Sequence, residues 1–294
     1  MLMLNDGGAF DWWFRAGMEY PAVFLFFAFW IFAFGACLGS FLNVCIWRIP
    51  HGESVVSAPS HCTKCGAEIR WYDNLPVISY LVLRGRCRSC RQPYSPRYLI
   101  VEVLTGILFV ALFVKAGLAR QPIPVLAVYF PMAMLIVTTC WIDAEHRLIP
   151  DLTTYPALAL GLIFSAAFPS IRGVESHLAS LGCAAASAAI VAFALGLFEL
   201  AGRRIAGCPV LGWGDVKFAA ATAALIGLPG AIFSVGAGAL VGTFYGIGLA
   251  LSTGRRLRRL TIPFGPFLAG AALVWMFAGE WILRWYLQFC RLAQ

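Results

Sequence analysis

Residues 20–47 read YPAVFLFFAFWIFAFGACLGSFLNVCIW, a stretch without a single charged side chain. At about 1.5 Å per residue, a helix of this length exceeds the roughly 30 Å of a bilayer core. The stretch is also too long for the apolar part of a signal peptide, and no small-residue cleavage site follows it, so we expect a retained helix. Uncharged or nearly uncharged stretches recur at 98–114, 121–142, 152–171, 178–198, 218–254 and 260–279.

The stretch 218–254 is too long for one span, because a single helix over it would measure about 55 Å. We therefore expect a break at the GLPG sequence of residues 227–230, which gives eight spans in all. The composition, 61% hydrophobic and 12% charged, is also far from that of a soluble domain. The predicted fold class is an all-α polytopic membrane protein with about eight transmembrane helices.

Basic residues are distributed unequally between the two sides of these spans. If eight spans alternate, 16 of the 22 Lys and Arg residues fall on one side, in 48–97, at Arg147, in 203–217 and in 255–259. The positive-inside rule makes this side cytoplasmic and places both ends of the chain on the other side. The net charge of +8 then fits contact with anionic lipid, and a nucleic-acid partner is not expected.

Two aspartates lie where apolar stretches end on the predicted cytoplasmic side. Asp143 follows the third span, and Asp215 precedes the sixth within the GWGD sequence of residues 212–215. An ionisable group beside hydrocarbon is a functional hypothesis by default. Two close carboxylates share one proton, so one activates water while the other donates a proton to the substrate. Asp143 and Asp215 are therefore the predicted catalytic pair of a peptide hydrolase.

Position along a helix suggests different roles for the two aspartates. Asp215 is expected near a helix N-terminus, which favours the anion, and Asp143 at a helix C-terminus, which disfavours it. This predicts Asp215 as the base and Asp143 as the acid. Asp151 precedes a span and is expected to cap that helix. Glu102 lies inside the second span, where a structural hydrogen bond and a place along a substrate path are equally supported.

The small and polar residues near the end of the first span are expected to have a structural role. Gly39, Ser40 and Asn43 lie within five residues of one another. Small side chains let two membrane helices approach closely, so we expect helix packing here.

Four cysteines form two pairs in the predicted cytoplasmic loop. Cys62 and Cys65 are separated by two residues, and the same spacing recurs at Cys87 and Cys90 after 21 further residues. This spacing is typical of a structural zinc site with four thiolate ligands, and the rival, disulfide pairing, is disfavoured in a reducing cytoplasm. The predicted organisation is a first helix with its N-terminal segment (1–47), a zinc-bound loop domain (48–97) and a seven-helix core (98–294).

Seven motifs now stand in order along nearly the whole chain. They are GSFLNV at 39–44, the two cysteine pairs, WYDNLP at 71–76, RYLIVE at 97–102, IDAEHRLIPD at 142–151, GWGDVK at 212–217 and PFGPF at 263–267. Together they resemble the bacterial type IV prepilin peptidases, also called leader peptidase/N-methyltransferases, of the Gly-x-Gly-Asp membrane aspartyl protease group.

The resemblance implies an activity that composition alone does not. Such enzymes remove the leader from type IV prepilins or type II secretion pseudopilins at the cytoplasmic face of the bacterial inner membrane. The family's catalytic aspartates map onto Asp143 and Asp215. Many members then methylate the new N-terminus with S-adenosylmethionine, for which we expect a site near the loop and the first span. No glycine-rich nucleotide-binding motif follows a strand here.

Two other classes of function are compatible with parts of the pattern. One is a zinc-ribbon membrane scaffold, and the other is a transporter whose intramembrane acids relay protons. Transporter sites usually lie near the bilayer midplane, whereas both aspartates are expected at one membrane face. The peptidase is therefore the favoured interpretation.

Overall fold

A computed structural model describes residues 20–56, 60–119, 121, 123–254 and 262–292. This part of the chain is helical, without a β-strand, and it divides into two compact units, Met1–Leu126 and Ala127–Gln294. The expected N-terminal segment 1–19 and the basic turn 255–259 lie outside the described residues.

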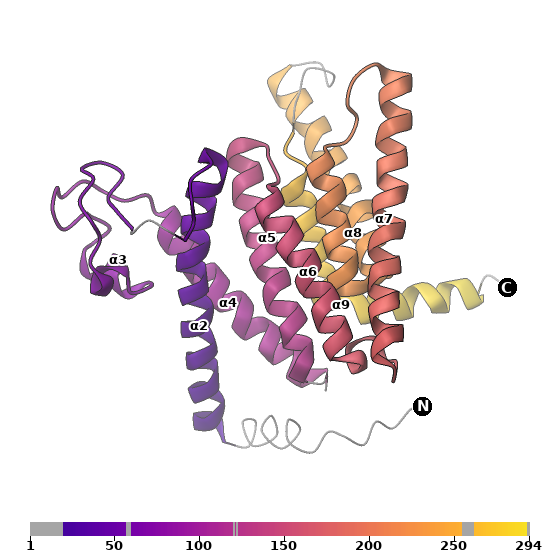
Figure 1. The fold of residues 1–294 in the computed structure, drawn as a ribbon, viewed down its shortest axis with the longest axis horizontal. Coiled ribbons are helices and arrows are strands. Elements are labelled where there is room, and N and C mark those ends of the chain that lie inside the picture. The colour runs from indigo at the N-terminus through magenta and orange to yellow at the C-terminus, as the bar shows by residue number, and fades with distance from the viewer. Residues whose placement is uncertain (1–19, 57–59, 120, 122, 255–261, 293–294) are drawn as a thin grey trace. The chain divides into compact units, whose positions relative to one another are not determined.

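The first unit is a pair of long helices joined by a loop region. Its elements are α2 (Pro21–Arg48), η1 (Ile49–His51), η2 (Trp71–Asn74), α3 (Ile78–Val82), α4 (Arg97–Leu118) and η3 (Ile123–Val125). Helix α2 packs along α4 (Figure 1). A Cβ atom on Gly39 would lie 2.8 Å from the Cα atom of Glu102, so the absence of a side chain permits this approach. The predicted helix packing at Gly39 is confirmed.

The second unit is a helical bundle. Its elements are α5 (Leu126–His146), α6 (Asp151–Ala167), η4 (Pro169–Arg172), α7 (His177–Ala206), α8 (Trp213–Thr253) and α9 (Gly265–Leu292). Helix α8 contacts α6, α7 and α9, and Figure 1 shows these helices side by side. The contacting part of α8 is rich in small side chains, with residues 219–224 buried. A bundle of closely spaced helices follows from that composition.

The apolar stretches form helices, although α7 and α9 extend well beyond the predicted stretches 178–198 and 260–279. Within the described residues, α2, α4, α5, α7, α8 and α9 are long and apolar enough to cross a membrane, whereas α6 has 17 residues. The 41-residue α8 is interrupted at Gly227, where φ is 83° and ψ is 169°. Gly227 adopts this positive φ without a side-chain clash, and Pro229 nearby lacks a backbone donor. The expected fold class and the break at residue 227 are confirmed, and the chain is a multi-pass membrane protein.

Candidate active site and metal centre

Asp143 lies in the last turn of α5 and is 5% exposed. Its Oδ2 accepts a hydrogen bond from the backbone N–H of Gly265, the first residue of α9, at 2.8 Å. A Cβ atom on Gly265 would lie 2.8 Å from the same oxygen, so only glycine fits without displacement. The N-terminus of α9 therefore holds this carboxylate in place.

Asp215 is the third residue of α8 and is partly buried. Its Oδ2 accepts a hydrogen bond from the Gly212 N–H at 3.2 Å, as the third residue of a helix does in a capping box. A Cβ atom on Gly212 would lie 2.8 Å from that oxygen, and one on Gly214 would lie 2.9 Å from the Cβ of Ile149. The absence of a side chain at each of these glycines therefore permits the close contacts with Asp215 and Ile149.

The structure places the two predicted catalytic residues at the same end of the second unit although 71 residues separate them in the sequence, because Ile149, six residues after Asp143, lies against Gly214, next to Asp215. The helix positions on which the acid and base assignment rests are confirmed, but they do not support different roles. Asp143 ends α5, but its carboxylate also lies at a helix N-terminus, that of α9. Helix position therefore does not distinguish the two groups, and a shared proton belongs to the pair.

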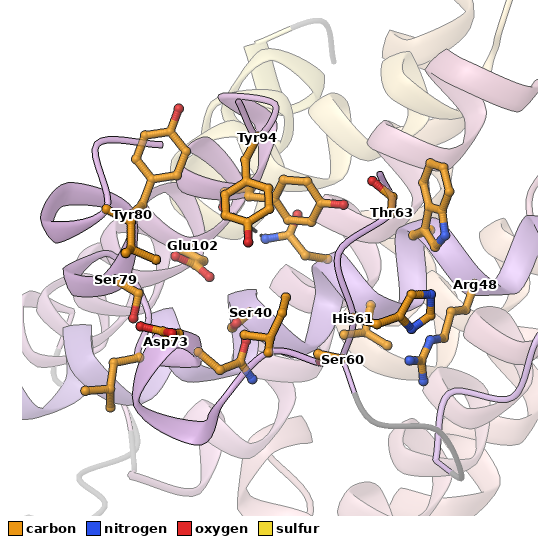
Figure 2. A pocket seen from close by; sticks show the side chains of 18 residues that line it. Ser40, Arg48, Ser60, His61, Thr63, Asp73, Ser79, Tyr80, Tyr94 and Glu102 are labelled. Atoms are coloured by element: carbon orange, nitrogen blue, oxygen red, sulfur yellow. Dashed lines mark hydrogen bonds between the residues drawn. The ribbon is translucent and has the colours of Figure 1, made fainter. Parts of the chain in front are cut away.

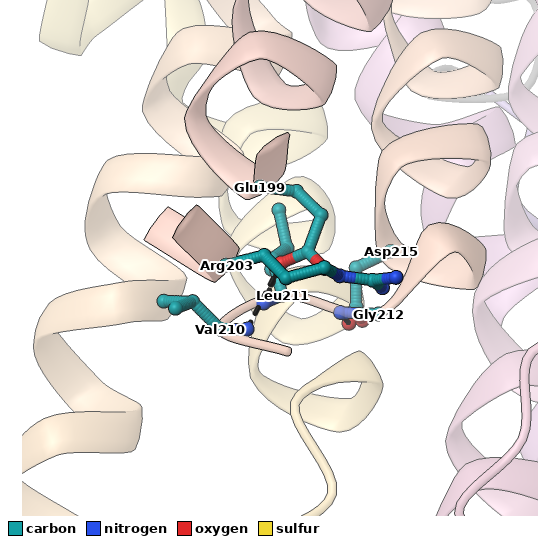
Figure 3. Close-up of polar contacts among 6 residues, drawn as sticks. All are labelled: Glu199, Arg203, Val210, Leu211, Gly212 and Asp215. Atoms are coloured by element: carbon teal, nitrogen blue, oxygen red, sulfur yellow. Dashed lines mark hydrogen bonds and ion pairs between the residues drawn. The ribbon is translucent and has the colours of Figure 1, made fainter. Parts of the chain in front are cut away.

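Glu199 of α7 holds the loop that leads to Asp215, and the sequence reasoning missed it. Its side chain is 1% exposed, and its Oε2 accepts hydrogen bonds from the N–H groups of Val210 at 2.9 Å and Leu211 at 2.6 Å. Arg203 donates to the other oxygen, Oε1, at 2.8 Å (Figure 3). The available signal was a glutamate at the end of an uncharged stretch, four residues before an arginine.

Asp151 does not cap α6, so that prediction is wrong. Pro150 occupies the cap position, without a side-chain cap, and the helix begins at Asp151. Because it lies one residue inside the helix, the Asp151 carboxylate pairs instead with the Lys217 ammonium of α8 at 2.6 Å. The Lys217 nitrogen also lies 5.3 Å from the centre of the Tyr155 ring. These contacts fix the start of α6 to the first turn of α8, close to Asp215.

The two cysteine pairs of the first unit adopt the same local structure. In one, the Cys62 N–H donates to Ala67 O and the Gly66 N–H donates to Cys62 O. In the other, the Cys87 N–H donates to Gln92 O and the Arg91 N–H donates to Cys87 O. The fifth residue of each has a positive φ, 72° at Gly66 and 61° at Arg91. Each pair is therefore a tight knuckle that directs two thiols to one side.

The four thiol sulfurs of Cys62, Cys65, Cys87 and Cys90 lie within 4.8 Å of one another. Cys62 Sγ and Cys90 Sγ are 3.9 Å apart. Tetrahedral coordination with metal–sulfur bonds of about 2.3 Å separates neighbouring sulfurs by about 3.8 Å, so the cluster fits a metal ion. Backbone N–H groups of Cys90 and Ser89 donate to Cys87 and lower the pKa of its thiol to about 6, whereas desolvation and the other three thiols raise the pKa of Cys90 to about 11. A thiolate is the form that binds metal.

Glu102 of α4 has a structural hydrogen bond and also lines a cavity. Its Oε2 accepts a hydrogen bond from the Val77 N–H at 2.8 Å. The cavity lies in the first unit and also includes Asn43 of α2. The structural hydrogen bond that the sequence left open is therefore confirmed, and the place along a substrate path stays a prediction.

The fold is that of a multi-pass membrane protein, in which the loop before Asp215 and the end of α5 at Asp143 lie in one helical bundle. Residues 128–247 match the type IV leader peptidase family, and residues 33–116 match the bacterial peptidase A24 N-terminal domain. The chain belongs to the type IV leader peptidase family, which confirms the resemblance drawn from its motifs.

Similar proteins from three bacteria bear the name prepilin leader peptidase/N-methyltransferase. The Aeromonas hydrophila protein is 33% identical over 87% of this chain and 92% of its own length. The Dichelobacter nodosus protein is 34% identical over 82% of this chain and 88% of its own. The Myxococcus xanthus protein is 34% identical over 78% of this chain, which spans 65% of that relative. No solved structure matches the chain.

Proposed function

We propose that this protein is a membrane peptidase that removes the leader peptide from type IV prepilins and pseudopilins and then methylates the new N-terminus. The observation that carries the peptidase is the carboxylate pair of Asp143 and Asp215, each held by the N–H of a glycine at a helix N-terminus. Family membership and the names of the relatives support the substrate class and the methylation.

Cleavage follows from the chemistry of two carboxylates that share one proton. The ionised member takes a proton from water, and the water oxygen bonds to the carbonyl carbon of the scissile peptide. The protonated member gives its proton to the leaving nitrogen as the C–N bond breaks. Gly265 and Gly212 hold the two carboxylates through backbone donors, so little rearrangement is required.

The proposed location is the bacterial inner membrane, with the aspartate pair facing the cytoplasm. The basic residues near the pair, including Arg147 and Lys217, support this orientation through the positive-inside rule. The apolar helix of a prepilin would lie in the bilayer against the seven-helix core of residues 98–294, with its leader in the cytoplasm. The scissile bond would then lie at the depth of the aspartates.

Two cofactors belong to the proposal. Zinc would be held by the four thiols of the loop domain, residues 48–97, because their spacing fits tetrahedral coordination. Its contribution would be structural, since a loop with little core gains its order from such an ion. S-adenosylmethionine would supply the methyl group.

The test is mass spectrometry of a prepilin incubated with the purified full-length protein and S-adenosylmethionine. Loss of the leader together with one added methyl group on the new N-terminus is the expected result. Cleavage without methylation would contradict the proposed methylation but not the proposed peptidase activity. If a range of prepilins and pseudopilins all remained intact, this result would favour the scaffold or transporter interpretation.

Glu199→Gln is expected to lower kcat for leader removal about 10-fold or more. The buried carboxylate accepts two backbone N–H groups and an arginine, and bonds to a charged acceptor are each worth roughly 1.5–3 kcal/mol. An amide cannot accept all of them, so the loop before Asp215 loses its fixed position. The measurement is steady-state cleavage, with hydrogen exchange at residues 210–212 as a second readout.

Glu280→Gln is the matched control, because the Glu280 side chain is 51% exposed and also pairs with an arginine four residues later. This control is expected to retain wild-type cleavage. Faster exchange at 210–212 with unchanged kcat would show that the loop position does not matter for cleavage.

A further inference from the structure

A cavity in the first unit lies between the second half of α2, the start of α4 and the cysteine loop (Figure 2). We call it the loop cavity. The empty space between its lining atoms, including the mouth, is about 960 Å³. Side chains from all three segments line this space, so a ligand in the loop cavity would contact each of them.

Asn43 supplies a buried acceptor without a partner in this cavity. The residue is 3% exposed, and its Nδ2 donates to the Tyr98 carbonyl at 2.9 Å. A carbonyl only accepts, so this bond fixes the orientation of the amide. Asn43 Oδ1 then has no hydrogen-bond partner among the described residues. An unsatisfied buried acceptor is unfavourable, so the site suits a ligand with an N–H or O–H group.

Glu102 supplies negative charge to the same cavity. The residue is 9% exposed, and its carboxylate accepts hydrogen bonds from the Val77 N–H and the Ser40 hydroxyl but contacts no cationic side chain among the described residues. Val77 has a φ of 63°, which is rare for a β-branched residue and is associated with ligand sites. A buried carboxylate with this environment favours a ligand that carries positive charge.

Aromatic rings and opposite charges complete the lining. Trp47, Tyr80, Tyr94 and Tyr98 all line the loop cavity. Figure 2 shows Arg48 and His61 on one side and Asp73 and Glu102 on the other. Aromatic faces attract cations and stack on planar rings. The cavity therefore suits a molecule that combines a planar base, several hydrogen-bond donors, a cationic centre and a carboxylate.

We propose that the loop cavity binds S-adenosylmethionine, an inference that rests on the methylation included in the proposed function. Asn43 would accept a hydrogen bond from the ligand, Glu102 would face its positive charge, and the aromatic rings would contact the adenine and the sulfonium. When bound, the cofactor supplies a methyl group to the substrate's neutral amine: the N–C bond forms, the S–C bond breaks to leave a thioether, and the amine releases a proton.

The cysteine knuckles connect the metal site to this cavity. His61 and Thr63, on either side of Cys62, line the cavity, and so does Tyr94 beyond the second knuckle. An ion held by the four thiols would therefore fix one wall of the cavity. The role of this metal ion in methylation would then be to shape the binding site for the cofactor.

The test is equilibrium binding of radiolabelled S-adenosylmethionine to the purified, zinc-loaded full-length protein, with and without a cleaved substrate. Asn43→Leu removes the unsatisfied acceptor at similar volume and is expected to weaken binding about 10-fold or more. Thr105→Val is the matched control. It also removes a buried polar atom from the first unit, but Thr105 bonds within its own helix and lies outside the cavity lining. We expect wild-type binding in this control.

Asp143→Asn distinguishes cofactor binding from peptidase activity. Because Asp143 lies in the second unit, this variant is expected to bind the cofactor with wild-type affinity. Wild-type affinity in Asn43→Leu, or no binding to the wild-type protein with or without cleaved substrate, would overturn the site assignment even if cleavage proceeds normally. Photocrosslinking of the labelled cofactor gives a readout independent of variant folding. Label in peptides from 40–48, 60–63 or 71–102 supports the loop cavity, and label confined to α5–α9 contradicts it.

Discussion

Asp143→Asn and Asp215→Asn are each expected to slow leader removal at least about 1,000-fold. General acid–base catalysis by a positioned side chain contributes roughly 100- to 10,000-fold, and an amide neither takes nor gives the proton. Each substitution preserves side-chain shape and an oxygen that can accept from Gly265 or Gly212. The fold should therefore survive, and thermal unfolding in detergent should stay near that of the wild type.

Glu145→Gln provides the comparison for these variants. Glu145 lies two residues from Asp143, but it is exposed and contacts His146 at 3.9 Å. Its replacement should change the cleavage rate by less than about threefold, because an exposed ion pair contributes little. A large loss in Glu145→Gln would mean that charge near the membrane surface, and not the aspartate pair, governs the rate.

The second large effect is expected from the double variant Cys62→Ser, Cys65→Ser. Removing one knuckle leaves two of the four thiols, so bound zinc should fall from one per chain to nearly none. Structural zinc sites with four ligands contribute roughly 10–16 kcal/mol of apparent binding free energy at neutral pH, so the loop should lose its order. We expect methylation to fall about 100-fold or more. Elemental analysis and mass spectrometry of the product give the two readouts.

Cys37→Ser, Cys183→Ser is the control for thiol removal, because both cysteines are exposed on helices and lie outside the cluster. It should retain full zinc content. Unchanged zinc in the Cys62, Cys65 variant would show that these thiols do not hold the metal. Zinc loss with unchanged methylation would leave the metal site but contradict its connection to the loop cavity.

The sequence predicted the features that depend on local composition. Uncharged stretches gave the helices, and the GLPG sequence gave the break at Gly227, because chain length and backbone freedom act locally. The spacing of Cys62, Cys65, Cys87 and Cys90 gave the cluster, since a two-residue separation itself forms a knuckle. These features required no knowledge of how distant helices pack.

The features that escaped prediction all depend on contacts between distant residues. The bond from Gly265 to Asp143 joins residues 122 positions apart, and it removed the basis for separate acid and base roles. Glu199 receives the loop before Asp215 only because α7 lies beside α8. The position of Asp151 before an apolar stretch suggested a helix cap, whereas in the structure its carboxylate pairs with Lys217 of another helix. Asn43 fitted helix packing, but its unpaired oxygen became visible only with the loop cavity.

The central claim is that Asp143 and Asp215 act as one catalytic unit on a peptide bond. The most direct measurement is the prepilin cleavage rate, followed by mass spectrometry, for wild type, Asp143→Asn, Asp215→Asn and the double variant. Groups that act as a unit give non-additive losses, so all three variants should share the same residual rate. Losses that multiply in the double variant, or a single variant that keeps more than about one tenth of the wild-type rate, would contradict the claim.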